Sequence, residues 1–370
     1  MKADKIGLYV HIPFCKSKCK YCDFCSFTDA DKESYLDALI RDIDSYKGCQ
    51  IEVNSVFFGG GTPSLLSGEQ MEKLFFHLRN SFDVSCDSEI TLEAIPKTLT
   101  SENLEAYIRS GINRISLGLQ SIHENELKKL GRIHNFSEFL ETYNMVRNNG
   151  VNNLNVDLMY GIPEQNKESF EKTLSEIIKL SPEHISVYGL ILEEGTPLYA
   201  HSRQLSLPTE DEECDMYYMA AEFLRESGYS HYEISNYAKK GFRCAHNLKY
   251  WNDEEYIGFG LAAHSYFGKK RYANPVEFSE YFSPEWQEYR QIDEICDKDN
   301  AYEYAMMHLR LADGFLLSDY ERRFKKTFAN DKRPFIEELI KNGYMQITDG
   351  RISLTEKGFY VSNSILSEIL

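Results

Sequence analysis

Basic side chains are scarce in this chain relative to acidic ones. Its 370 residues include 41 Lys and Arg against 58 Asp and Glu, which gives a formal net charge of −17. Nucleic-acid surfaces need clustered Lys and Arg, and anionic lipid surfaces attract the same residues. The charge therefore argues against nucleic-acid binding and against electrostatic attraction to a lipid surface.

Long hydrophobic runs are missing as well. No run of 18 apolar residues occurs, so no transmembrane helix is expected. The first apolar run, residues 6–14, is interrupted by His11 and Pro13, unlike the core of a secretory signal peptide. Nine cysteines without such a signal favour a reducing compartment, with buried or metal-binding thiols. We therefore expect a globular cytoplasmic protein of about two domains.

Three of the cysteines lie close together near the start of the chain. Cys15, Cys19 and Cys22 have the spacing C-x3-C-x2-C and directly follow the apolar run. Three thiolates on one short loop can hold three corners of a cubic [4Fe–4S] cluster. Phe24 occupies the position of a fourth ligand, which leaves one iron open to another molecule. The alternatives are scattered buried thiols or a zinc site, although zinc sites usually have paired C-x2-C units and the chain has no second pair elsewhere.

Strand-like and helix-like segments alternate up to about residue 230. Phe170, Leu174 and Ile177 have the spacing of one helix face, and a similar pattern begins at Ser101 and ends at Gly111. Such β/α repeats imply a parallel sheet covered by helices, with ligands at the carboxyl ends of the strands. Six repeats are too few for a closed eight-stranded barrel. The expected strands are residues 6–12, 53–58, 90–94, 114–119, 154–160 and 184–192.

The pattern changes after the barrel-like segment, residues 1–230. We expect a loop-rich extension over residues 231–290, with one short strand at 232–237. Residues 291–370 predict a small α+β, winged-helix-like domain with a hairpin around Asp349-Gly350. The apolar end of this domain, residues 364–370, is a candidate for peripheral contact with a membrane partner.

The segment from Cys15 to Phe24 resembles the signature of the radical S-adenosylmethionine (SAM) superfamily. The resemblance implies a partial (β/α)6 barrel, a [4Fe–4S] cluster and SAM chelated by the open iron. In that superfamily one electron from the cluster cleaves SAM to a 5′-deoxyadenosyl radical, so an electron donor is also implied. The positions that match the cofactor-binding positions of the family are Tyr9, Tyr21, Gly60, Gly61, Thr62, Glu93, Gln120, Arg132 and Asp157.

Each of these positions also has a purely structural alternative. The glycines can form a plain tight turn, and Glu93 can cap a helix. Arg132 can make a surface ion pair instead of pairing with the SAM carboxylate, and Asp157 can bond a neighbouring loop. Ile95 stands where the family often has Asn, a departure that weakens the assignment of the loop after Glu93.

Two branches of the superfamily are similar to this chain. One is the oxygen-independent coproporphyrinogen III oxidases, which decarboxylate propionate side chains, and the other is the radical SAM haem chaperone (HemW) family. The oxidases carry a further cysteine where Phe24 stands, and a longer segment before the position of Tyr9. The resemblance therefore favours a haem chaperone that transfers haem to respiratory or other haem proteins, with the oxidase as the alternative.

The motif His246-Asn247-Leu248-Lys249-Tyr250-Trp251 resembles the haem-binding signature of the chaperone branch. A neutral imidazole is a good axial ligand of haem iron, and the two aromatic rings offer flat faces to a porphyrin. The structural alternative is a loop histidine with two core aromatics. Cys244 and His264 are further candidates for a haem ligand beside His246.

Overall fold

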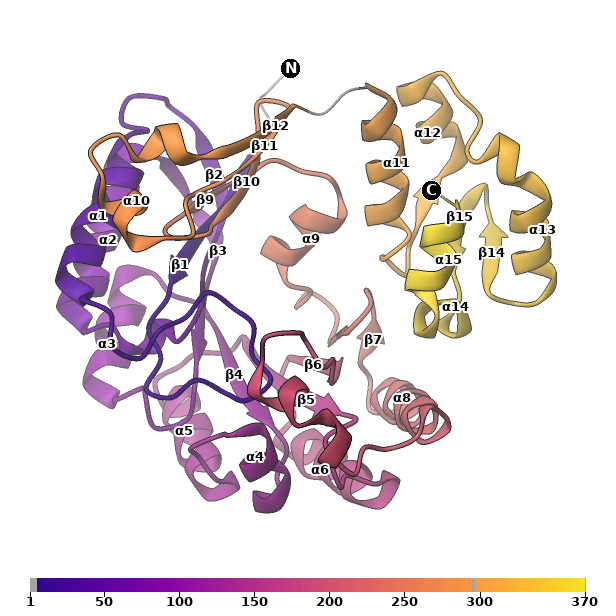
Figure 1. Ribbon diagram of the computed structural model, residues 1–370, viewed down its shortest axis with the longest axis horizontal. Coiled ribbons are helices and arrows are strands. Elements are labelled where there is room, and N and C mark those ends of the chain that lie inside the picture. The colour runs from indigo at the N-terminus through magenta and orange to yellow at the C-terminus, as the bar shows by residue number, and fades with distance from the viewer. Residues whose placement is uncertain (1–4, 295–296, 370) are drawn as a thin grey trace.

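The computed structural model describes residues 5–294 and 297–369, and its centre is one large curved sheet (Figure 1). Within these residues the sheet has twelve strands in the order β12-β11-β10-β9-β1-β2-β3-β4-β5-β6-β8-β7. Strands β1 to β6 are parallel to one another. They are β1 (Ile6–Ile12), β2 (Glu52–Gly60), β3 (Asp83–Ala94), β4 (Arg114–Gln120), β5 (Leu154–Tyr160) and β6 (His184–Gly189).

Helices connect these strands and lie on the outside of the curve in Figure 1. Their ends follow the sequence signals: α3 has Thr100 as its N-cap, and Gly111 ends it with φ 115°, a conformation that glycine adopts without a Cβ clash. The parallel strands with outer helices confirm the predicted partial (β/α)6 barrel. The helices between these strands are α1 (Lys32–Asp44), α2 (Gly68–Ser81), α3 (Ser101–Ser110), α4 (Glu124–Leu130), α5 (Phe136–Asn148) and α6 (Lys167–Leu180), and α7 (Pro197–Ala200) and α8 (Glu210–Glu226) follow β6.

Short strands in and beside the segment 231–290, where the sequence predicted a loop-rich extension, lengthen the sheet at both edges. Strand β9 pairs in parallel with β1, and β8 pairs antiparallel with β6. The short strand expected at 232–237 is replaced by β7 and β8 on either side of a turn, and β6 ends before residue 192. The elements are β7 (Ser230–His231), β8 (Asn236–Ala238), α9 (Ala245–Trp251), β9 (Tyr256–Phe259), β10 (His264–Phe267), β11 (Lys270–Ala273), α10 (Phe278–Phe282) and β12 (Gln291–Glu294).

A small domain with its own core follows and lies beside α8 and α9 in Figure 1. Its hairpin forms where the sequence predicted it, and ion pairs such as Arg225–Glu356 and Arg323–Asp253 connect it to the barrel. Its elements are α11 (Asp297–His308), β13 (Phe315–Leu316), α12 (Leu317–Phe324), α13 (Arg333–Lys341), β14 (Met345–Thr348), β15 (Arg351–Leu354), α14 (Glu356–Tyr360) and α15 (Ser362–Ile369).

The apolar end of the chain does not face outward as a membrane contact would require. Ile365, Leu366 and Ile369 are buried in the core of the small domain, so the predicted peripheral contact through them is wrong. Leu370 lies outside the described residues. No helix in the described part of the chain combines the length and the apolar character needed to cross a bilayer.

Candidate functional site

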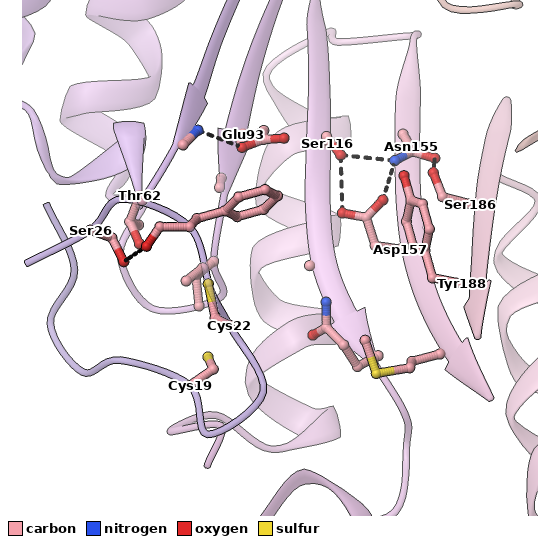
Figure 2. Close-up of a pocket in the computed structure, with 18 of the residues that line it drawn as sticks. Cys19, Cys22, Ser26, Thr62, Glu93, Ser116, Asn155, Asp157, Ser186 and Tyr188 are labelled. Carbon is pink, nitrogen blue, oxygen red and sulfur yellow. Dashed lines mark hydrogen bonds between the residues drawn. The ribbon is translucent and has the colours of Figure 1, made fainter. Parts of the chain in front are cut away.

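A cavity of about 500 Å³ lies inside the barrel, between the carboxyl ends of the strands and the cysteine-bearing loop. Figure 2 shows Cys19 and Cys22 on this loop at one side, with Glu93, Ser116 and Asp157 on strands across from it. The cluster and SAM positions that the sequence indicated, together with His246, line this one cavity: Tyr9, Cys15, Cys19, Tyr21, Cys22, Gly60, Gly61, Thr62, Glu93, Gln120, Arg132, Asp157 and His246.

The cysteine loop is held in place by backbone hydrogen bonds at both of its ends. The Cys15 N–H donates to the Phe27 carbonyl at 2.9 Å, and the Phe27 N–H donates to the Pro13 carbonyl at 2.7 Å. Thr62 donates its hydroxyl to Cys15 Sγ at 3.6 Å. The two ends of the loop are thus fixed to each other, and the thiols between them line the cavity.

The thiols of this loop lie near enough to influence one another. Burial raises the pKa of the Cys22 thiol, and Cys19 and Cys15 raise it further, against the opposing effect of the Phe24 backbone N–H. A bound metal relieves such repulsion, because thiolates are then paired with cations. Among the described residues, no three His, Cys, Asp or Glu side chains converge on one ion. A cubic cluster needs a different arrangement, one thiolate to each of three irons, and the loop fits that requirement.

Gly60 and Glu93 form one wall of the cavity. The Gly60 N–H donates to Glu93 Oε2 at 3.2 Å, and Gly60 has φ 108°. A Cβ added to Gly60 would clash with the His11 ring, so the backbone passes this close to His11 only because the residue is glycine. Glu93 does not cap α3, whose N-cap is Thr100. Burial, followed by the nearby Asp157, raises the pKa of Glu93 to about 8.

Arg132 and Gln120 line the cavity with polar atoms that lack partners. Arg132 donates to the Tyr21 hydroxyl at 2.7 Å, and its buried Nε has no hydrogen-bond partner in the described structure. Arg132 therefore does not make the surface ion pair that was the alternative. The Gln120 Oε1 atom is also buried without a partner there. Buried polar atoms are nearly always paired, so such atoms around a cavity indicate a ligand.

Asp157 is hydrogen-bonded to a side chain of its own strand and to one of β4, and not to a loop. Its carboxylate accepts hydrogen bonds from Ser116 at 3.2 Å and from Asn155 at 2.7 Å, as Figure 2 shows. Burial raises the pKa of Asp157, and these hydrogen bonds oppose the shift. Sequence reasoning missed the lining residues Arg114, Ser116, Asn155, Ser186 and Tyr188. The signal that could have found Arg114 and Ser116 is their spacing of two residues from Gly118 and Gln120 on one strand face.

His246 lies at the start of α9 and is 1% exposed. Its Nδ1 is 3.0 Å from Ser55 Oγ and its Nε2 is 2.8 Å from the Tyr250 hydroxyl, so both ring nitrogens have partners. The ring also stacks on Phe57, with centroids 5.4 Å apart. Burial, with smaller contributions from Lys249 and Arg114, lowers the pKa of His246 to about 3, so the imidazole is neutral.

The two further candidates for a haem ligand do not line this cavity. Cys244 is completely buried and its thiol donates to Glu89 at 3.5 Å. Burial raises the pKa of Cys244 to about 12, which disfavours the thiolate that binds metal. His264 lies on β10 with an exposed side chain. His246 is thus the one of the three that contributes to the cavity wall.

Comparison with known proteins extends the similarity over the whole chain. The Radical SAM superfamily model matches residues 9–177, and the HemN C-terminal domain model matches residues 296–361. A protein of Lactococcus lactis named Heme chaperone HemW is 34% identical over 98% of this chain and 96% of its own length. Its namesake from Escherichia coli is 35% identical over 100% of this chain and 99% of its own length.

Among solved structures, the coproporphyrinogen III oxidase HemN from Escherichia coli, a radical SAM enzyme, superposes with a TM-score of 0.85. It is 25% identical, and the match covers 99% of this chain and 90% of that protein. Radical SAM proteins hold a [4Fe–4S] cluster and SAM, which agrees with the cysteine loop and the cavity beside it. Because the curated relatives exceed 30% identity over nearly their full length, this chain belongs to the HemW haem chaperone family of radical SAM proteins.

Proposed function

We propose that this protein is a haem chaperone that receives haem and transfers it to haem-dependent, respiratory proteins. In this proposal Cys15, Cys19 and Cys22 hold a [4Fe–4S] cluster, and SAM binds at its open iron. The observation that carries the proposal is the arrangement of the cysteine loop and His246 around one cavity in a chain of this family. The proposal also includes a cytoplasmic location and a separate protein that donates electrons to the cluster.

The residues between the cysteine loop and His246 suit a SAM molecule. When bound, the cluster would supply one electron to SAM beside it. The Gly60 backbone and the Glu93 carboxylate can accept or orient the polar groups of SAM, and Arg132 can pair with its carboxylate. Tyr9, Tyr21, Thr62, Gln120 and Asp157 complete this part of the wall.

His246 contacts haem in this proposal. A neutral imidazole can bind iron directly, but its Nε2 must first give up the Tyr250 hydroxyl, or its Nδ1 must give up Ser55. Tyr250 and Asn247, which also line the cavity, add an aromatic face and an amide to the same wall.

We expect His246→Ala to weaken haem binding by about tenfold or more, because the contacts of one buried polar group are lost. The measurement is a haem titration followed by the Soret band, with thermal unfolding as a check on the fold. His264→Ala, at an exposed site away from the cavity, is the matched control and should bind like the wild type. Equal affinity of His246→Ala and wild type would refute the haem contact, and a wild-type protein without any Soret change would refute the function.

The second candidate function is oxidation of coproporphyrinogen III, favoured by the full-length superposition on HemN. Phe24, which is 62% exposed and lies at the cavity in place of the oxidases' further cysteine, argues against it. Anaerobic incubation with SAM, a reductant and coproporphyrinogen III separates the two functions. We expect no protoporphyrinogen, and its formation would overturn the chaperone proposal.

A further inference from the structure

A buried arginine lies at the deep end of the cavity. Arg114 begins β4, is 2% exposed and is nevertheless part of the cavity lining. In the parallel register, Ser116 pairs with Glu93 and Arg114 pairs with Thr91. Arg114 therefore lies two residues further from the strand ends than the Glu93 level, a separation of roughly 7 Å. This places its backbone deeper in the barrel than that of Glu93.

The Arg114 guanidinium has no hydrogen bond or ion pair with another side chain in the described part of the chain, and its Nε atom is buried without a partner. Two carboxylates act on it electrostatically, Glu89 and Asp157, but both are engaged elsewhere. Glu89 accepts hydrogen bonds from the Ala245 and His246 N–H groups at the start of α9, and Asp157 accepts from Ser116 and Asn155.

An unpaired guanidinium in the interior is unfavourable, because a buried charge needs a counter-charge and hydrogen bonds. The described protein supplies counter-charge at a distance, from Glu89 and Asp157, but no hydrogen-bond acceptor for the guanidinium, so that acceptor is expected to come from the ligand in the cavity. The guanidinium presents parallel N–H donors that match the two oxygens of a carboxylate. The missing partner is therefore an anion, with a carboxylate as the best geometric match.

Arg114 lies at the same end of the cavity as His246. Burial lowers the pKa of both His246 and His184, and the charge of Arg114 lowers both further. His184 Nδ1 is hydrogen-bonded to Asn155 Oδ1 at 2.6 Å, and both residues line this end of the cavity. The wall that faces the proposed haem contact is thus polar, and Arg114 supplies its positive charge.

We propose that Arg114 binds a carboxylate of the cavity's ligand and that this carboxylate is a propionate of haem. The inference rests on the haem binding proposed above and adds a residue that determines the orientation of haem in the cavity. A porphyrin carries its propionates on one edge, so one fixed cation at the deep end orients that edge inward. In a protein with a net charge of −17, this local cation also compensates the repulsion of an anionic ligand.

The test compares ferric haem with its dimethyl ester, in which both propionates are esterified and uncharged. Wild-type protein should bind haem about tenfold or more tightly than the ester, because a charge-assisted hydrogen bond is lost with esterification. Arg114→Gln should lower the affinity for haem to that for the ester and leave the affinity for the ester within about twofold of wild type. Arg114→Lys keeps the charge without the paired donors, so its affinity for haem should lie between those of wild type and Arg114→Gln.

Arg109→Gln, an exposed arginine on α3, is the control for removal of a positive charge. The comparison of the two ligands on wild-type protein needs no variant, so it stands even where Arg114→Gln does not fold. Equal wild-type affinity for haem and ester, or equal weakening of both by Arg114→Gln, would overturn the role of Arg114 and leave haem binding intact. Absence of any haem binding by the wild type would overturn the proposed function and this inference together.

Discussion

Serine in place of any one of Cys15, Cys19 or Cys22 is expected to abolish the [4Fe–4S] cluster. Each thiolate would hold a different iron, and the serine hydroxyl is a far poorer ligand than a thiolate at neutral pH. After anaerobic reconstitution, wild-type protein should contain about four irons and four sulfides per chain, and each variant close to none. Chemical analysis of iron and sulfide, together with the visible absorbance of the cluster, measures the difference.

Cys25 offers a matched control for these variants. It follows Cys22 on the same loop with C-x2-C spacing, so the sequence alone makes it a rival ligand. In the structure it does not line the cavity, and it packs against the barrel core while His11 Nε2 contacts its carbonyl at 2.8 Å. Cys25→Ser should therefore keep the full cluster. A cluster that survives Cys22→Ser but is lost with Cys25→Ser would show that the ligands are assigned wrongly.

The barrel strands could be predicted from the sequence, because strands buried on both faces are nearly continuous apolar runs. The edge strands could not. Strands β10 and β11 are four residues long and mix Lys270, Arg271 and His264 with aromatics, and β9 contains Gly258. Their strand character depends on partners such as β1, which lies more than 200 residues away along the chain. This strand pairing depends on the tertiary structure, and local sequence patterns do not predict it.

The site residues also divide into those that the local sequence predicts and those that only the fold shows. The cysteines and the residues proposed to face SAM stand at strand ends or in motifs, where the sequence indicates them directly. Arg114 is the first residue of β4, far from the strand end where ligands are expected, and the fold shows that it lines the cavity. For His246 the motif predicts the position, but its contact with Ser55, 191 residues away, is visible only in the fold.

The affinity for SAM is expected to rise with pH up to about 8 and then to level off. Glu93 has a pKa of about 8 because burial and Asp157 disfavour its charged form. A carboxylate that accepts hydrogen bonds from the amino group or the ribose hydroxyls of SAM must be ionised. Below the pKa each binding event therefore releases a proton, and the affinity rises by about tenfold per pH unit. Above the pKa no proton is released, and the slope disappears.

Glu93→Gln tests the origin of this pH dependence. The amide does not ionise, so the affinity of the variant should be independent of pH through this range. At pH 9 it should be about 100-fold weaker than that of wild type, because two charge-assisted hydrogen bonds become neutral ones. Calorimetric titration of reconstituted protein, in two buffers with different ionisation enthalpies, measures the affinity and the protons released. Glu102→Gln, on the surface of α3, is the control and should behave as wild type. If Glu93→Gln keeps the wild-type slope, the proton comes from another group, and Asp157, with its pKa also raised by burial, is then the residue to substitute.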